Sequence, residues 1–226
     1  MTRAANRLRS YFVTGTDTGV GKTLVSAALL HALAKRHDRV VGMKAVAAGG
    51  SMIDGVFVND DVLALRAAST YRVPAELDNP VRLREPVSPH LAARLDGVRI
   101  DIDYIVICHQ QLLALADAVV VEGAGGFLVP LSDGLTGADL AVALGLPVVL
   151  VVGLRLGCLN HALLTAEAIA ARGLTLAGWV ANHIDPAMLA QAENIAFLIE
   201  RLAAPLLGVV PYQTLPDATK IALNLP

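Results

Sequence analysis

Short apolar runs alternate with longer stretches of helical character along the chain, and they predict a series of buried strands. The runs are rich in valine and show no polar alternation, as in PVVLVV at 147–152. Apolar strands separated by helices are typical of a parallel sheet with helices on both faces. We therefore expect strands at 11–14, 40–46, 118–121, 147–152, 176–181 and 206–210, with helices at 22–35, 105–116, 159–172 and 187–202.

Residues 47–89 interrupt this alternation. The segment holds a glycine pair at 49–50 and prolines at 74, 80, 86 and 89. It is too long for a simple connector, and long irregular segments in compact domains are often functional. No repeat or linker divides the chain. The pattern predicts a flexible N-terminal tail at 1–10 followed by one α/β domain at 11–226.

Composition narrows the class of protein. Hydrophobic residues make up 55% of the 226 residues and charged residues 17%, which excludes a disordered chain. The net charge of −2 argues against a nucleic-acid partner. The longest uncharged run, 140–154, is too short to span a membrane, and the N-terminus lacks the apolar region of a secretory signal. With two cysteines and no CxxC pair, we expect a cytoplasmic protein without a membrane partner.

The strongest local motif is VTGTDTGVGKT at 13–23, between a predicted strand and a predicted helix. A phosphate loop needs this context, because backbone N–H groups at a helix N-terminus bind phosphate. Lys22 is then expected at the phosphates and the Thr23 hydroxyl at Mg²⁺. Thr16 stands where the motif has its first glycine, with Gly15 one place early. The alternative is a glycine-rich turn with a chance Gly-Lys-Thr.

Two further charged residues end predicted strands. Lys44 lies near the end of the strand at 40–46, and Glu122 directly follows the strand at 118–121. Ligands of doubly wound sheets bind beyond the carboxyl ends of the strands. Lys44 therefore faces either phosphates or a carboxylate substrate, or it extends into solvent. Glu122 is either the metal-binding acid of a phosphate-loop site or the cap of a turn.

Asp61 opens a helical stretch within the irregular segment. It is either a helix N-cap or a second metal acid. Because Mg²⁺ takes few protein ligands beside phosphate and water, Thr23, Asp61 and Glu122 form a plausible set.

Together these motifs resemble the dethiobiotin synthetase family. The similarity is ordered along almost the whole chain from residue 11 onward. It rests on the stretches YFVTGTDTGVGKT at 11–23, GMKAV at 42–46, DVLAL at 61–65, EPVSPH at 85–90, VEGAGGFLVPLSD at 121–133, LPVVLVVGLRLGCLNHALLTAEAI at 146–169, LTLAGWVAN at 174–182 and APLLGVVPY at 204–212.

The resemblance implies a P-loop NTPase-like α/β fold and a ligase of biotin biosynthesis. Such an enzyme closes a cyclic urea from 7,8-diaminopelargonate, CO₂ or bicarbonate, and Mg·ATP, and it releases dethiobiotin, ADP and phosphate. A carbamate forms first, ATP converts it to a carbamic–phosphoric mixed anhydride, and the second amine displaces phosphate. The family is a homodimer with its sites near the subunit interface.

Carried onto this sequence, the resemblance assigns three groups of residues. Lys44 is the catalytic lysine, assisted by Lys22, and Thr23, Asp61 and Glu122 bind Mg²⁺. The substrate group is Lys44, Ala48, Gly157, Cys158, Leu159 and Asn160, the last four from the partner subunit. The nucleotide group is Gly19, Val20, Gly21, Lys22, Thr23, Leu24, Asp61, Glu122, Gly123, Ala124, Gly125, Asn182, His183, Pro211, Tyr212 and Gln213.

The chain departs from the family at several positions. Gly19 stands where the family often has an acid, Ala48 where it has Ser or Thr, Ala45 where proline is common, and Asn194 where an aromatic contacts substrate. These changes affect substrate affinity more than reaction type. The alternative function is an ATPase switch or scaffold of the partitioning and maturation type. Many of those proteins carry an extra lysine early in the loop, where this chain has Thr16 and Asp17.

Overall fold

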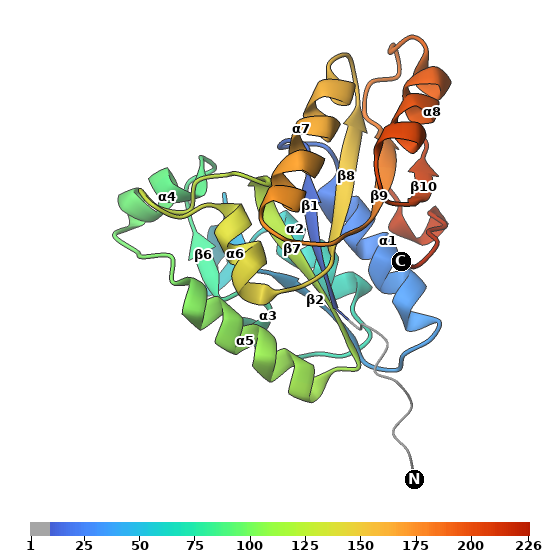
Figure 1. The fold of residues 1–226 in the computed structure, drawn as a ribbon. Helices are drawn as coiled ribbons and strands as arrows, with labels where there is room; N and C mark the ends of the chain where they lie inside the picture. Colours follow the sequence, from blue (N-terminus) through green and yellow to red (C-terminus); the bar gives the residue numbers. More distant parts are fainter. Residues whose placement is uncertain (1–9) are drawn as a thin grey trace.

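The computed structural model describes residues 10–226 and centres on a six-stranded parallel sheet with strand order β10-β9-β8-β1-β7-β2 (Figure 1). Because every neighbouring pair is parallel, all six carboxyl ends lie at one edge of the sheet. The strands are β1 (Ser10–Gly15), β2 (Val40–Lys44), β7 (Ala118–Gly126), β8 (Val148–Leu154), β9 (Leu176–His183) and β10 (Leu206–Val210).

Helices cover both faces of this sheet, as the continuous apolar strands predict. On one face α1 (Lys22–Ala34) and α2 (Asp60–Ala68) pack on alternate strand residues such as Val13 and Val149. The other face carries α5 (Ile102–Leu115), α6 (Gly137–Leu144), α7 (Cys158–Ala171) and α8 (Gln191–Arg201). Trp179 is fully buried on this second face, beneath α7 and α8.

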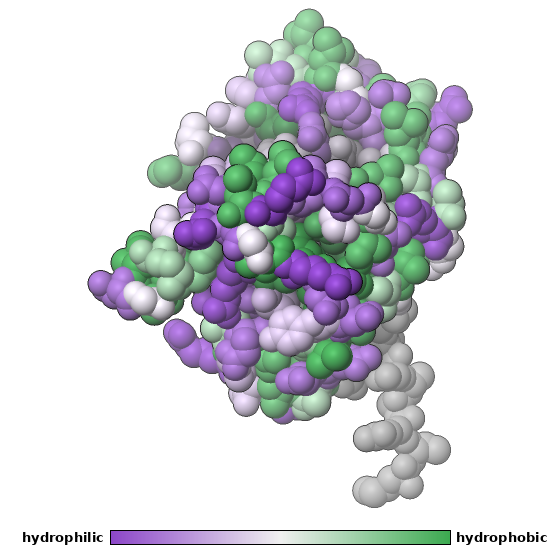
Figure 2. Space-filling view, turned by 90° about the vertical axis from the view of Figure 1, so that its left-hand side faces the viewer, coloured by the Kyte–Doolittle hydropathy of each residue, from purple (hydrophilic) through white to green (hydrophobic). Residues whose placement is uncertain are grey.

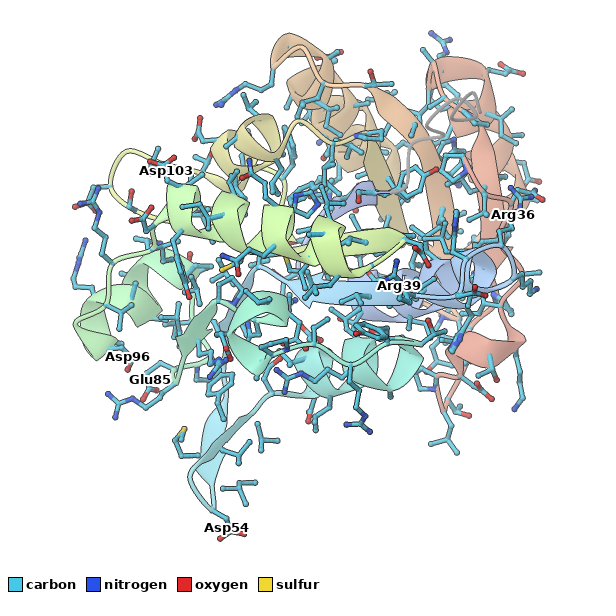
Figure 3. All side chains as sticks on the ribbon, turned by 90° about the horizontal axis from the view of Figure 1, so that it is seen from below. Arg36, Arg39, Asp54, Glu85, Asp96 and Asp103 are labelled. Carbon is cyan, nitrogen blue, oxygen red and sulfur yellow. The ribbon has the colours of Figure 1, made fainter. Side chains whose placement is uncertain are left out.

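The irregular segment forms a small addition beside β2. It contains β3 (Val46–Ala48), β4 (Ser51–Ile53), β5 (Val56–Val58), α3 (Ala75–Asp78), β6 (Val81–Leu83) and α4 (Pro89–Asp96). Strands β3 and β6 pair in parallel as a second sheet, and β4 and β5 form an antiparallel hairpin. Asp54, at the tip of this hairpin, projects away from the body of the protein (Figure 3). The short 3₁₀ helix η1 (Ala218–Lys220) follows β10.

The predicted fold class is confirmed, and several boundaries differ. The strand predicted at 40–46 ends at Lys44, where the chain changes sheets, and the strand predicted at 118–121 continues to Gly126. Helix α6 was not predicted, although Thr136 and Asp139 form the capping box that begins it. The tail predicted at 1–10 falls on residues 1–9, outside the described part, while Ser10 already lies in β1.

The described residues contain no candidate for a membrane-spanning helix. Among residues 10–226, no helix has the length and apolar character needed to cross a bilayer. Hydrophilic and hydrophobic side chains are interspersed across the face drawn in Figure 2.

Candidate active site

The phosphate loop connects β1 to α1 at the carboxyl edge of the sheet. Gly21 is the N-cap of α1 with φ of 89°, and no side chain among residues 10–226 caps the helix. The first N–H groups of α1 therefore lack a side-chain acceptor and can bind an anion. The buried Lys22 side chain folds back over the loop, with Nζ 3.0 Å from the carbonyl oxygen of Asp17.

Lys44 and Glu122 lie side by side because β2 and β7 are neighbours in register. The two residues are Cα partners in the parallel ladder. Lys44 is the last residue of β2, whereas β7 continues past Glu122 to Gly126. Lys44 is 5% exposed and Glu122 is 0% exposed, with Nζ 2.6 Å from Oε1. A buried charge needs a partner, and these residues supply one another.

Asp61 joins this pair from the first turn of α2. Its Oδ2 lies 2.7 Å from Lys44 Nζ, and its Oδ1 lies 2.7 Å from the Thr23 hydroxyl. Thr23 Oγ1 is also 3.0 Å from Glu122 Oε1. The N-cap of α2 is Asn59, whose side chain accepts a hydrogen bond from Val62 N, so Asp61 is not the cap.

Burial and opposite charges set the pKa values of the cluster. Burial lowers the pKa of Lys44, but Glu122 and Asp61 outweigh it, so the net pKa is raised. Burial raises the pKa of Asp61, and Lys44 and Thr23 reverse this, leaving the pKa below its usual value. Lys22 forms no ion pair with a carboxylate of residues 10–226, and burial together with the charge of Lys44 lowers its pKa to about 8.

These groups line a cavity of about 690 Å³, which we call the site cavity. The phosphate loop, the ends of β2 and β7, and the start of α2 form one side of it. Residues 86–89 before and at the start of α4 close the other side. Of the residues predicted for the site, it contains Gly19, Gly21, Lys22, Thr23, Lys44, Ala48, Asp61, Glu122, Ala124 and Gly125.

The donor set of the site cavity fits a hard divalent cation. Thr23, Asp61 and Glu122 offer only oxygen ligands, which Mg²⁺ prefers. Glu122 Oε2 is buried and has no hydrogen-bond partner within the described chain. No cluster of three or more His, Cys, Asp or Glu able to hold a metal occurs within residues 10–226. An Mg²⁺ ion held here therefore needs phosphate oxygens and water to complete its octahedral coordination.

The residues predicted for adenine lie beside the site cavity and do not line it. Asn182 and His183 end β9, and Val210 of the neighbouring β10 is the ladder partner of Asn182. Pro211, Tyr212 and Gln213 therefore emerge at the same edge. Asn182 contacts the phosphate loop itself, through a 2.8 Å hydrogen bond from Nδ2 to the Val20 carbonyl oxygen.

Three other predicted nucleotide contacts also fall outside the cavity. Val20 is fully buried against the core, Leu24 packs partly on the same core, and Gly123 lies in β7 beyond Glu122.

The residues predicted for the substrate carboxylate also lie apart from the site cavity. Gly157 is the N-cap of α7, Cys158 is the buried first residue of that helix, and Leu159 packs partly against the apolar core under α7 and α8. Asn160 is exposed on the first turn. Within one subunit the structure does not bring these residues to Lys44.

The structure adds residues that the sequence reasoning missed. Thr18, Ser88 and Val129 line the site cavity, and Arg155 of the β8–α7 loop forms an ion pair with Asp17 of the phosphate loop. The Ser88 hydroxyl lies 2.9 Å from His90 Nδ1. The position of Ser88 in the irregular segment was the sequence feature that could have predicted its place in the site cavity. No local sequence pattern predicts the Arg155–Asp17 ion pair.

Comparison with solved structures defines the class of the protein. The chain resembles the MinD–MinC cell division complex of Aquifex aeolicus, with a TM-score of 0.55 and 18% identity over 91% of this chain and 82% of that one. It also resembles a ParA family ATPase of Chlorobium tepidum, with a TM-score of 0.56 and 12% identity over 92% and 86%. At these identities the likeness concerns the fold alone. The protein is thus a P-loop-type α/β protein with a buried lysine–carboxylate site.

Sequence comparison gives the family within that class. A family profile described as an AAA domain matches residues 9–220. A curated relative, the ATP-dependent dethiobiotin synthetase BioD of Aromatoleum aromaticum, is 54% identical over 217 residues, which is 96% of each chain. The chain belongs to the dethiobiotin synthetase family and is therefore a ligase. The switch or scaffold alternative has support only from the shared fold.

Proposed function

We propose that the protein closes the cyclic urea of dethiobiotin from 7,8-diaminopelargonate, CO₂ and ATP, releasing ADP and phosphate. The observation that carries this proposal is Lys44, a buried ammonium held between two carboxylates in the cavity that also contains the phosphate loop. The 54% identical relative supports the same reaction. The cavity of about 690 Å³ has room for reacting groups beside the phosphates.

The reaction places negative charge where the two lysines lie. One amine of the substrate adds to CO₂ and loses a proton, giving a carbamate. A carbamate oxygen then takes the γ-phosphoryl group, and the second amine attacks the carbamoyl carbon, expelling phosphate and losing its proton. Preorganised cations stabilise the charge that develops during phosphoryl transfer. Lys44 is the catalytic residue for the carbamate and transferred phosphoryl group, and Lys22 binds the phosphates.

Thr23, Asp61 and Glu122 would hold Mg²⁺ in this proposal. The ion supplies charge neutralisation at the β- and γ-phosphates when bound. The unpartnered Glu122 Oε2 supports this assignment. Asn182, His183 and residues 211–213 would surround adenine, since they lie at the strand edge next to the phosphate loop.

We further propose a homodimer in which the partner supplies the start of α7. The substrate carries its carboxylate at the end of an apolar chain, away from its amines, so an anchor near Lys44 is not required. The N-terminus of α7, which no side chain of the described residues caps, offers N–H groups to an anion. Leu156 beside it is 95% exposed in the single subunit, which supports a surface that another subunit covers. The free, buried Cys108 and Cys158 fit a cytoplasmic enzyme.

Purified protein tests the reaction directly. ADP release should require both diaminopelargonate and bicarbonate, and dethiobiotin should accumulate in equal amount. ATP turnover that is indifferent to both compounds would instead support the switch. Sedimentation of the same preparation measures whether the chain is a dimer.

A further inference from the structure

Strand β2 leaves the main sheet immediately after Lys44. Lys44 is still the ladder partner of Glu122, but the next N–H, that of Ala45, lies 3.4 Å from the Glu122 carbonyl oxygen. Val46 already pairs with Val81 of β6 in the second sheet. The main chain of the proposed catalytic lysine therefore lies at a junction between two sheets, where regular ladder hydrogen bonds do not hold it on both sides.

Asn79 supplies a hydrogen bond at this junction. Its side-chain Nδ2 donates to the carbonyl oxygen of Lys44 at 2.9 Å and to that of Val81 at 3.1 Å. Both amide hydrogens are used, one on each side of the junction. A single side chain, 35 residues from Lys44 along the sequence, thus ties the end of β2 to the start of β6.

Burying this amide is costly, and the cost needs an explanation. Asn79 is 0% exposed, and its Oδ1 has no hydrogen-bond partner within the described chain. An unpaired buried polar atom destabilises a fold. The two carbonyl contacts of Nδ2 account for an amide at this position, because an apolar side chain there would leave both carbonyl oxygens without this donor.

We propose that Asn79 is a positioning residue for Lys44. It fixes the carbonyl of Lys44, and with it the direction from which the lysine side chain reaches the site cavity. The inference rests on the proposed function, in which the Lys44 ammonium acts on the reacting groups. That ammonium lies 2.7 Å from Asp61 and 2.6 Å from Glu122, so a small displacement of its backbone breaks contacts that set its place.

A purely structural role for Asn79 has a matched comparison in Ser69. The Ser69 hydroxyl accepts a hydrogen bond from Gly42 N at 2.9 Å and donates one to Leu65 O at 2.8 Å. It supports the same edge strand two residues before Lys44, but it does not contact Lys44. Loss of either side chain weakens the attachment of β2, whereas only the loss of Asn79 releases the lysine carbonyl.

The experiment compares Asn79→Leu and Asn79→Ala with Ser69→Ala in dethiobiotin formation. Asn79→Leu removes both donors at similar volume, and Asn79→Ala removes them without overpacking should the leucine variant fail to fold. We expect kcat to fall about ten- to a hundredfold in the Asn79 variants, as for a misplaced catalytic group. KM for ATP should stay within about twofold, since the phosphate loop is untouched, and Ser69→Ala should keep kcat within about threefold.

A double-mutant cycle separates positioning from general destabilisation. In a Lys44→Ala background, Asn79→Ala should cause no further loss of kcat, because the residue acts through the lysine. A further loss equal to that in the wild-type background, or a kcat no lower than that of Ser69→Ala, would overturn the inference. If Lys44→Ala itself keeps wild-type activity, Lys44 has no catalytic role and the inference fails. If the wild-type protein forms no dethiobiotin from diaminopelargonate, bicarbonate and ATP, the proposed function fails instead, so the two failures are distinguishable.

Discussion

The side-chain amide of Asn182 donates a 2.8 Å hydrogen bond to the main-chain carbonyl of Val20, joining the end of β9 to the phosphate loop. The contact is so close that it leaves no room for a side chain on the neighbouring Gly21. A Cβ built at Gly21 would lie 2.1 Å from Asn182 Nδ2. The loop conformation therefore depends on a strand two positions away in the sheet, beyond β8.

Gly21→Ala is expected to raise KM for ATP by at least about tenfold. Two effects combine, the clash with Asn182 and about 1–2 kcal/mol of left-handed strain at φ of 89°. Gly19→Ala is the matched control, because it has φ of 74° with nothing within 4 Å of its Cβ. Steady-state kinetics of both variants, and of Gly21→Ala combined with Asn182→Ala, give the measurement. Equal effects at both glycines would show that the Asn182 contact is unimportant.

Lys44→Ala and Lys22→Ala are expected to lower product formation by about a hundredfold or more, since each removes a charge from the site cavity. Lys35→Ala should have no such effect, because Lys35 is exposed at the end of α1. Circular dichroism establishes that each variant is folded before dethiobiotin formation is measured. Near-wild-type synthesis by Lys44→Ala would remove this residue from the mechanism.

Asp61→Asn and Glu122→Gln are expected to raise the Mg²⁺ concentration needed for half-maximal activity by at least about tenfold. Both changes replace a charged oxygen ligand with a neutral amide. Asp60→Asn serves as the control, because Asp60 is the exposed neighbouring acid in the first turn of α2. Activity measured against free Mg²⁺, with a chelator series at the low end, tests the assignment. An unchanged Mg²⁺ dependence in Asp61→Asn would mean that this carboxylate does not bind the metal and only forms hydrogen bonds with Thr23 and Lys44.

Asn160→Asp is expected to weaken diaminopelargonate binding and to leave ATP binding nearly intact. The substitution places a negative charge on the exposed first turn of α7, where the substrate carboxylate is proposed to bind. Asn224→Asp, in the C-terminal segment, adds the same charge outside the proposed site. The apparent affinity of each substrate for both variants is the measurement. Unchanged diaminopelargonate affinity would mean that the carboxylate binds elsewhere.

The free energy of unfolding should fall as pH drops from about 6.5 toward 4 because of His109. Burial lowers the pKa of this histidine to about 4. Between pH 6.5 and 4 the unfolded chain therefore binds a proton at His109 that the folded chain does not bind. Above pH 6.5 both states are neutral and His109 contributes no pH dependence. The loss amounts to about 3 kcal/mol by pH 4.

Denaturant unfolding at several pH values checks this prediction. His109→Leu should flatten the dependence between pH 6.5 and 4. Parallel curves for the wild type and His109→Leu would contradict it.

Apolar runs predicted the main sheet well, because a strand buried on both faces must be apolar throughout. The same signal did not locate the end of β2. Ala45 and Val46 are as buried as the strand before them, and burial does not reveal which strand a residue pairs with. The role of Asn79 could not be predicted from sequence for a related reason. Its two partners, the carbonyl oxygens of Lys44 and Val81, become neighbours only when the chain folds.

The candidate site could be predicted where it follows from strand order. Lys44 ends β2 and Glu122 ends the apolar run of β7, and the ladder between these adjacent parallel strands places the two residues side by side. The place of Asp61 depends on how α2 returns to the loop, which residue patterns do not specify.

The positive and negative side chains of the lysine–carboxylate cluster act as counter-ions to one another within the site cavity. Lys22 and Lys44 carry two positive charges, and Asp61 and Glu122 can carry two negative ones, so these four groups together have no net charge. Before any ligand binds, the ion pairs with Asp61 and Glu122 offset the desolvation penalty of burying the Lys44 ammonium. If Mg·ATP binds here as proposed, loading would be an exchange of ion pairs, in which Asp61 and Glu122 would hold the metal in place of Lys44 and Lys44 would pair with the phosphates.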